Sequence, residues 1–168
     1  RAEVDGVEFR VAWALAFAAA VSGQFREAAN SIQRIISGRE RQGTQRTDAD
    51  DDLLARSYLQ LELCRHIIGD FSVAISSWNS ARDLMARSPG LSAEIRAQIL
   101  CQLGAASVMT PDGLDRAAEF FQQAIVLAKT FSMPREMVDI SLGLSNLHLK
   151  RQGFSLARDA ARDALALS

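Results

Sequence analysis

The chain has 168 residues, of which 48% are hydrophobic and 23% charged, and its formal net charge is −1. This length suffices for one domain with a substantial core. The near-neutral charge argues against a dedicated nucleic-acid-binding protein, which usually carries a basic excess. The most apolar run, residues 11–21, is about half the roughly 20 residues that a membrane-spanning helix needs, so no membrane segment is expected.

The two cysteines predict a reduced protein. Cys64 and Cys101 are too few for a disulfide framework, and both lie in apolar helical segments where an unpaired cysteine behaves as a small hydrophobe. We therefore expect a cytoplasmic location. The sequence starts at Arg1 without a methionine and runs to its last residue in helix-like sequence, so we expect a segment of a longer chain.

The first third of the chain predicts two helices and a long loop. Every residue from 11 to 21 is apolar, which predicts that the helix over residues 4–22 is buried on nearly all sides. Gly23 ends it, and residues 25–37 form a second helix with Ala28 and Ile32 facing inward. Residues 38–52 have no hydrophobic period and are predicted to be a mobile loop. The acidic end of this stretch suits the start of the following helix.

The rest of the chain predicts six more helices, over residues 53–68, 71–87, 92–109, 114–131, 135–152 and 154–167. They are separated at Gly69, at Pro89-Gly90, at Gly113, before Pro134 and at Gly153. No segment alternates with period two, so the predicted class is all-α without a sheet. The helices pair into four antiparallel hairpins, at about 4–37, 53–87, 92–131 and 135–167, within a single domain over 1–168.

The second helices of these hairpins share a repeated pattern. They begin FREA, FSVA, LDRA and FSLA, and a glycine stands one or two residues ahead of each. The alanine that closes each pattern is Ala28, Ala74, Ala117 or Ala157, at spacings of 46, 43 and 40 residues. A large residue mostly follows four positions later and a small one seven positions later, as in Ala117, Phe121 and Ala124. Such alanines let another helix approach closely.

This pattern resembles the second helix of the tetratricopeptide repeat, and the resemblance covers roughly residues 8–168. Leu103-Gly104 also matches the Leu-Gly pair of that family's first helix. The corresponding pairs of the other hairpins depart from it: Leu15-Ala16, Leu61-Glu62 and Leu144-Ser145. The spacing exceeds the usual ~34 residues and is similar to that of MalT-type transcription activators, Rap-type regulators and kinesin light chains. HEAT and armadillo repeats share a period of ~40–47 residues and are the competing fold.

The resemblance implies an α-solenoid, a superhelix whose concave face is lined by the first helix of each hairpin. An apolar groove of this kind binds an amphipathic helix or an extended peptide, unless neighbouring repeats bury it. The residues that the repeat register places on this face are Arg10, Trp13, Phe17, Ala20, Arg56, Leu59, Leu63, His66, Gln98, Cys101, Ala105, Val108, Asp139, Leu142, Asn146 and Leu149.

No arrangement of residues predicts catalysis. His66 and His148 lie on different hairpins without further metal ligands at a suitable spacing. Cys64 and His66 are two residues apart on a helix, so their side chains diverge by about 200°. The acidic run 48–52 lacks the central glycine and distal glutamate of a calcium loop. We therefore expect no enzyme, no metal site and no cofactor.

The predicted function is that of a non-catalytic scaffold that binds proteins or peptides. Its expected partner is another protein or a peptide, and its own neighbouring domains and a second copy are among the candidates. We do not expect it to bind nucleic acid or a membrane. The alternative is a ligand-sensing regulatory module of a larger bacterial transcription activator. The sequence does not distinguish between the two.

Overall fold

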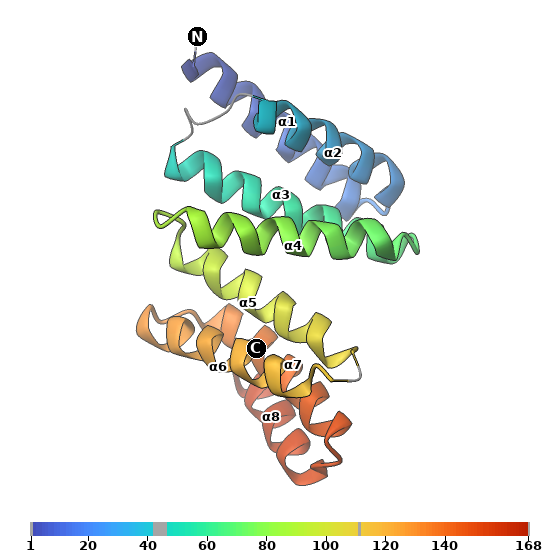
Figure 1. The fold of residues 1–168 in the computed structure, drawn as a ribbon, viewed down its shortest axis with the longest axis vertical. Coiled ribbons are helices and arrows are strands. Elements are labelled where there is room, and N and C mark those ends of the chain that lie inside the picture. Colours follow the sequence, from blue (N-terminus) through green and yellow to red (C-terminus); the bar gives the residue numbers. More distant parts are fainter. Residues whose placement is uncertain (1, 42–46, 111, 168) are drawn as a thin grey trace. The chain divides into compact units, whose positions relative to one another are not determined.

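The computed structural model describes residues 2–41, 47–110 and 112–167, and this part of the chain forms eight α-helices and no strand (Figure 1). The predicted all-α class is therefore confirmed. The helices are α1 (Ala2–Val21), α2 (Phe25–Arg41), α3 (Asp48–Ile67), α4 (Phe71–Arg87), α5 (Ala93–Val108), α6 (Leu114–Thr130), α7 (Pro134–Lys150) and α8 (Phe154–Leu167).

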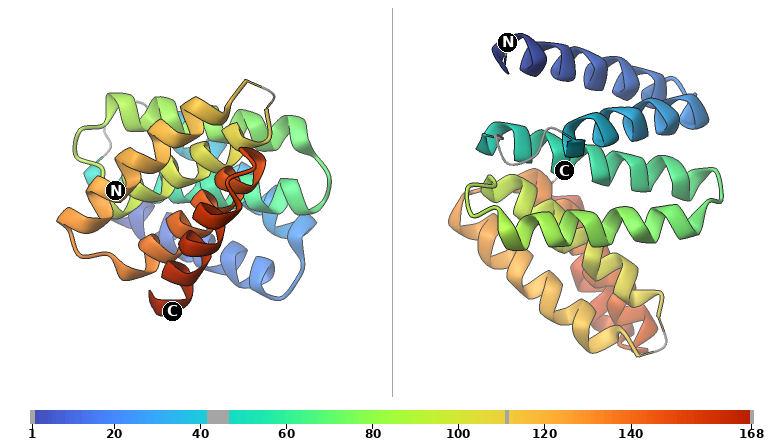
Figure 2. Two further views of the ribbon diagram at one scale, coloured as in Figure 1. Left: turned by 90° about the horizontal axis from the view of Figure 1, so that it is seen from below. Right: turned by 45° about the horizontal axis from the view of Figure 1, so that its top comes forward.

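The chain divides into two compact units where the sequence predicts a single domain. Unit 1 is Arg1–Leu91 and contains α1 to α4, whereas unit 2 is Ser92–Ser168 and contains α5 to α8. Each unit consists of two helical hairpins, whose paired helices lie side by side in both views of Figure 2. The packing pattern is the same in both units. Within each unit, every helix packs on the next one along the chain, and the first helices of the two hairpins, α1 with α3 and α5 with α7, also contact each other.

Four of the turns between helices share one backbone geometry. Each has three residues, and the middle one has a positive φ: 81° at Gly23, 82° at Gly69, 53° at Ser132 and 59° at Gln152. In each turn the middle N–H donates to the carbonyl three residues earlier, and the next N–H donates to the carbonyl five residues earlier. These hydrogen bonds close the last turn of the preceding helix in a Schellman motif.

The predicted mobile loop over residues 38–52 is wrong at both ends. Helix α2 continues to Arg41 and α3 begins at Asp48, so only residues 42–46 of this stretch lie outside the described residues. Thr47 caps α3 in a capping box: the Asp50 N–H donates to Thr47 Oγ1 over 3.2 Å, and the Thr47 N–H donates to Asp50 Oδ2 over 3.0 Å.

Polar side chains stabilise the end of α2 and the start of α3 in this stretch. Hydrophobic periodicity therefore did not predict these helical residues. Arg39, which is only 7% exposed, forms an ion pair with Asp50, and the Tyr58 hydroxyl donates a hydrogen bond to Glu40. Asp48, Asp50 and Asp51 in the first turn of α3 also suit the positive end of the helix dipole, as the sequence predicts.

Helix α1 is less buried than its apolar sequence predicts. Val11, Leu15 and Val21 are 55%, 69% and 73% exposed, whereas Ala16 and Ala20 are buried. The described residues of α1 pack against α2 and α3 and against no other helix. The prediction of burial on nearly all sides is therefore wrong, because the helix has neighbours on one side and presents apolar side chains on the other.

The alanines of the second-helix pattern are buried at helix interfaces. Ala28 and Ala117 are fully buried and Ala157 is 3% exposed, while the side chain of Ala74 lies outside the described residues. Seven residues further on, the alanines are buried too: Ala81, Ala124 and Ala164. This burial is what the repeat register predicts of these positions.

The Phe121 side chain of α6 packs against two glycines of neighbouring helices in unit 2. A Cβ placed on Gly104 of α5 would lie 2.8 Å from the Phe121 ring, and a Cβ on Gly143 of α7 would lie 2.4 Å from it. The ring itself is fully buried. Three helices therefore meet at one aromatic side chain, because two of them carry no side chain at the point of contact.

We predict that Gly143→Ala destabilises the protein by about 1–3 kcal/mol, because the added methyl group overpacks against Phe121. The matched control is Gly38→Ala, also within a helix, where an added Cβ meets nothing within 4 Å. This control should gain up to about 1 kcal/mol from the higher helix propensity of alanine. Urea unfolding measures both changes, and an unchanged midpoint in Gly143→Ala would contradict the proposed contact.

Candidate functional site

The predicted face of α1 contains a pair of stacked aromatic rings. The centroids of Trp13 and Phe17 lie 5.3 Å apart with an interplanar angle of 12°. Phe17 is 42% exposed, Trp13 is half-buried and Arg10 is exposed. Stacking shields part of each ring from water, but the pair still presents an apolar surface at this position.

The predicted residues of α3 form a mixed surface. Leu63 is 47% exposed, Arg56 and Leu59 are half-buried, and His66 is exposed. Because α1 and α3 contact each other within unit 1, the exposed apolar groups of the two helices belong to the same unit. Ala20 of α1, also predicted on this face, is only 4% exposed and belongs to the core.

In unit 2, the predicted residues of α5 and α7 do come together. Gln98 donates hydrogen bonds to Glu94 of its own helix and to Glu136 of α7, both over 3.3 Å. Burial and, as the smaller cause, the nearby carboxylate of Asp139 together raise the pKa of the Cys101 thiol to about 12. The thiol is therefore protonated at neutral pH, and it is a poor nucleophile.

Asp139 lies at the edge of this cluster. Partial burial raises the pKa of its carboxyl, against the effect of Arg135, and the neighbouring charge of Glu136 adds to the rise. The other predicted residues of α7 are open to solvent: Leu142, Asn146 and Leu149. On α5, Ala105 is exposed, but Val108 is only 5% exposed, so its predicted place on an open face is wrong.

Ala20 and Val108 each stand on the last turn of a first helix, and both side chains belong to the buried core.

Glu62 of α3 is a buried acid that sequence analysis singled out only as a departure from the Leu-Gly pattern. It is 5% exposed. Burial raises the pKa of Glu62 from 4.5 to about 7, and the indole N–H of Trp78 on α4 opposes this shift. That N–H does not reach full hydrogen-bond geometry, so burial dominates. On the same helix, His66 Nδ1 lies 3.8 Å from Glu62 Oε1.

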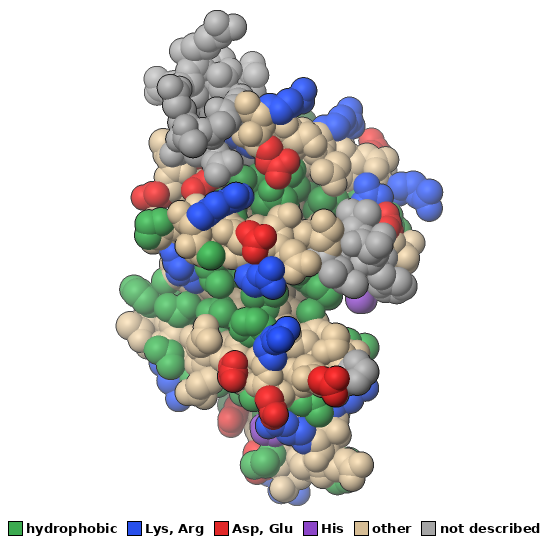
Figure 3. Space-filling view, in the orientation of Figure 1, with side chains coloured by type: hydrophobic (Ala, Val, Ile, Leu, Met, Phe, Trp, Pro, Cys, Tyr) green, Lys and Arg blue, Asp and Glu red, His purple; other side chains and the backbone are tan. Residues whose placement is uncertain are grey.

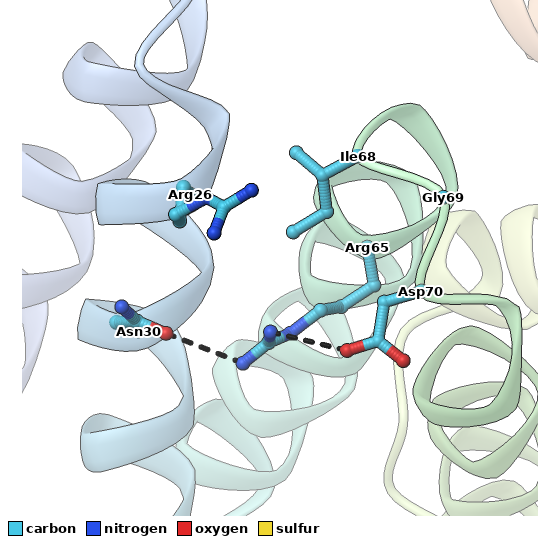
Figure 4. A pocket seen from close by; sticks show the side chains of 6 residues that line it. All are labelled: Arg26, Asn30, Arg65, Ile68, Gly69 and Asp70. Carbon is cyan, nitrogen blue, oxygen red and sulfur yellow. Dashed lines mark hydrogen bonds and ion pairs between the residues drawn. The ribbon is translucent and has the colours of Figure 1, made fainter.

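A polar pocket of about 400 Å³ lies in unit 1 between α2 and the turn from α3 to α4. It is lined by Arg26, Asn30, Arg65, Ile68, Gly69 and Asp70. Figure 4 shows Arg26 and Asn30 on α2 and, across the pocket, Arg65 of α3 with the turn residues. Arg65 donates to Asp70 Oδ2 and to Asn30 Oδ1, each over 3.3 Å. Sequence analysis missed this pocket.

A second hollow, of about 380 Å³, lies between α1 and α2. Alanines of α1 line it together with Leu15 and Ile35, and Glu27 and Arg34 contribute charged groups. It is the more apolar of the two hollows. It adjoins the exposed side of α1, where Leu15 is 69% exposed.

Charged side chains of both signs are interspersed on the face of the molecule shown in Figure 3. Acidic and basic groups alternate there with hydrophobic ones, and neither sign forms a continuous patch. Within the described ranges, no three side chains of His, Cys, Asp or Glu are grouped so that they could hold a metal ion. None of the helices in the described part of the chain has the length and hydropathy needed to span a bilayer.

The sequence matches no model of a known protein family and no curated protein. The resemblance to the tetratricopeptide repeat therefore depends on the motif residues quoted above.

We predict that Glu62→Gln changes how stability depends on pH. Below about pH 4.5 the carboxyl group is protonated in both the folded and the unfolded chain, so its ionisation does not lower the free energy of unfolding. As the pH rises toward about 7, the unfolded chain loses this proton first, and the free energy of unfolding falls. Above that pH, Glu62→Gln should be more stable than the natural chain by roughly 2–3 kcal/mol.

Urea unfolding at about pH 4 and about pH 8 tests this prediction. The matched control is Glu119→Gln, which removes an exposed carboxylate of α6. It should behave as the natural chain does at both values. A Glu62→Gln variant whose stability differs from the natural chain by the same amount at both pH values would contradict the buried, protonated state of Glu62.

Proposed function

We propose that this chain is a non-catalytic, tetratricopeptide-like scaffold that binds another protein or a peptide. The binding surface is an apolar face formed, within each unit, by the first helices of its two hairpins. The partner contributes an apolar segment, either an extended peptide or the apolar face of a helix. This proposal rests on the exposure of large hydrophobic side chains where the repeat register places a binding face.

The observation that carries it is the exposure of Phe17, Leu63 and Leu142 on three different first helices. Their exposed fractions are 42%, 47% and 50%. Single exposed apolar residues are ordinary on protein surfaces. Here, however, each stands at a position that the repeat assigns to the binding face. In the α-solenoid families this face binds partner segments.

Burial of apolar surface would drive such binding, at roughly 25 cal/mol per Å² before the costs of ordering the partner. We therefore expect affinity to depend weakly on salt.

The second candidate function is a ligand-sensing module within a larger transcription activator. The observation that favours it is the polar pocket beside Arg65, whose volume of about 400 Å³ suits a small molecule. The sequence of the intact chain distinguishes the two candidates. A nucleotide-binding domain before this segment and a helix-turn-helix after it would support the activator.

We predict that Leu63→Glu abolishes peptide binding and leaves the helicity unchanged, because it places a charge in an apolar groove at a side chain that is already 47% exposed. The control is Val126→Glu, the same kind of change at a 55% exposed position of the second helix α6. A peptide selected from a random library on the natural chain serves as the probe, and fluorescence polarisation measures its affinity.

Equal loss of binding in both variants would place the interaction outside the first helices. Loss of helicity in Leu63→Glu would show that Leu63 belongs to the core. In that event Leu142→Glu, at the equivalent open surface of unit 2, provides the second test of the groove.

A further inference from the structure

The polar pocket of unit 1 combines two arginines with one acid. Arg26 comes from the first turn of α2, Arg65 from the last turn of α3, and Asp70 from the turn that follows. The charges of these side chains sum to one positive charge at neutral pH. The pocket is therefore suited to an anion, and this suitability does not depend on the proposed peptide-binding groove.

Arg65 is held in position before any ligand arrives. Its two terminal nitrogens donate to Asn30 Oδ1 and Asp70 Oδ2, each over 3.3 Å, so the guanidinium is bound on both sides (Figure 4). Its third nitrogen, Nε, is buried and has no hydrogen-bond acceptor among the described residues. Each terminal nitrogen carries a second N–H, which is the donor that Arg65 can offer to a ligand.

Arg26 provides a second positive charge, with which no described residue pairs. Its side chain is exposed and makes no hydrogen bond or ion pair to a described residue, whereas Arg65 is only 18% exposed. Arg26 and Arg65 line the same hollow from opposite elements (Figure 4). An anion between them would receive charge-assisted hydrogen bonds from both sides.

The turn leaves room for the rest of a ligand. Gly69 has a φ of 82°, and a Cβ placed there would meet nothing within 4 Å, so the space beside it is open. Ile68 contributes an apolar wall to a pocket that is otherwise polar. The volume of about 400 Å³ lies within the range of small-molecule sites.

We propose that this pocket binds a small organic monocarboxylate, with its carboxylate between Arg26 and Arg65 and its apolar part against Ile68. One carboxylate matches the single net positive charge of the lining. A phosphate monoester carries almost two charges, and its excess charge would lie beside the carboxylate of Asp70. Ile68 favours a ligand with a hydrocarbon chain over a purely polar ion.

Hexanoate is the probe, and the Arg65 Nε–H signal in ¹⁵N NMR spectra reports its binding. We expect hexanoate to shift this signal in a saturable way, acetate to do so more weakly, and hexanol not to do so at all. Arg26→Gln should weaken hexanoate binding about tenfold, because one charge-assisted contact is lost. The control is Arg41→Gln, an exposed arginine on the same helix that does not line the pocket.

Asp70→Asn is the second variant, and it should tighten hexanoate binding several-fold. It removes the only acidic side chain among the described residues that line the pocket, and it keeps a residue suited to the N-cap position. Because this variant gains affinity, a failure to fold cannot imitate the expected result. Circular dichroism confirms that each variant keeps its helicity.

Four results would overturn the proposal. Hexanoate that leaves the Arg65 Nε–H signal unmoved, or that binds the Arg26→Gln variant as tightly as the natural chain, would show that the two arginines do not form a site. Tighter binding of inorganic phosphate than of hexanoate would exclude the carboxylate class. Tighter binding of an acetylated tripeptide with a free carboxyl end would identify a peptide, and not a small acid, as the source of the carboxylate.

Discussion

The close approach of the first helix of a hairpin to its second helix is the constraint on which the rest of the structure depends. In unit 2 this contact is Phe121 against Gly104, where the glycine admits the ring. In unit 1 the corresponding side chain is Trp78, and Glu62 occupies the position of the glycine. In the last hairpin Ser145 takes that position, and its hydroxyl donates to the Ala157 carbonyl over 2.9 Å. At this position of the first helix, the second helix is thus met by a glycine beside an aromatic ring, by a buried acid beside an indole, or by a hydroxyl that donates to the backbone.

Much of the fold could be predicted because hydrophobic periodicity reports directly on helices. Most predicted helix bounds lie within two residues of those in the structure, and the buried Ala117, Phe121 and Ala124 were identified from their spacing. The errors arose where other forces decide. Arg39 and Asp50 extend two helices through an ion pair. Leu15 stays exposed because a helix is buried only where it has a neighbour. Neither effect produces a periodic pattern of hydrophobic residues in the sequence.

The candidate site was harder to predict than the fold. Leu63 and Leu142 lie open at positions derived from the repeat, but whether a partner binds there remains a prediction. The pocket around Arg65 involves α2, α3 and a turn, so no window of sequence contains it. Glu62 did have a local signal: an acid within the apolar run Leu61-Glu62-Leu63-Cys64 requires an explanation. Burial beside Trp78 provides it.

Three of the four matching turns lie within hairpins, and they show how such a repeat can diverge while its backbone stays the same. At the turns into α2 and α4 the left-handed residue is Gly23 or Gly69, but at the turn into α8 it is Gln152, and the conspicuous Gly153 stands one residue later. A left-handed non-glycine residue is less favourable, so the hydrogen bonds and packing around it must compensate. The turn therefore depends on the dihedral angle and tolerates a change of residue. A comparison that aligns glycines would place this hairpin one residue out of register, whereas a comparison of backbone conformation would align the three turns within hairpins.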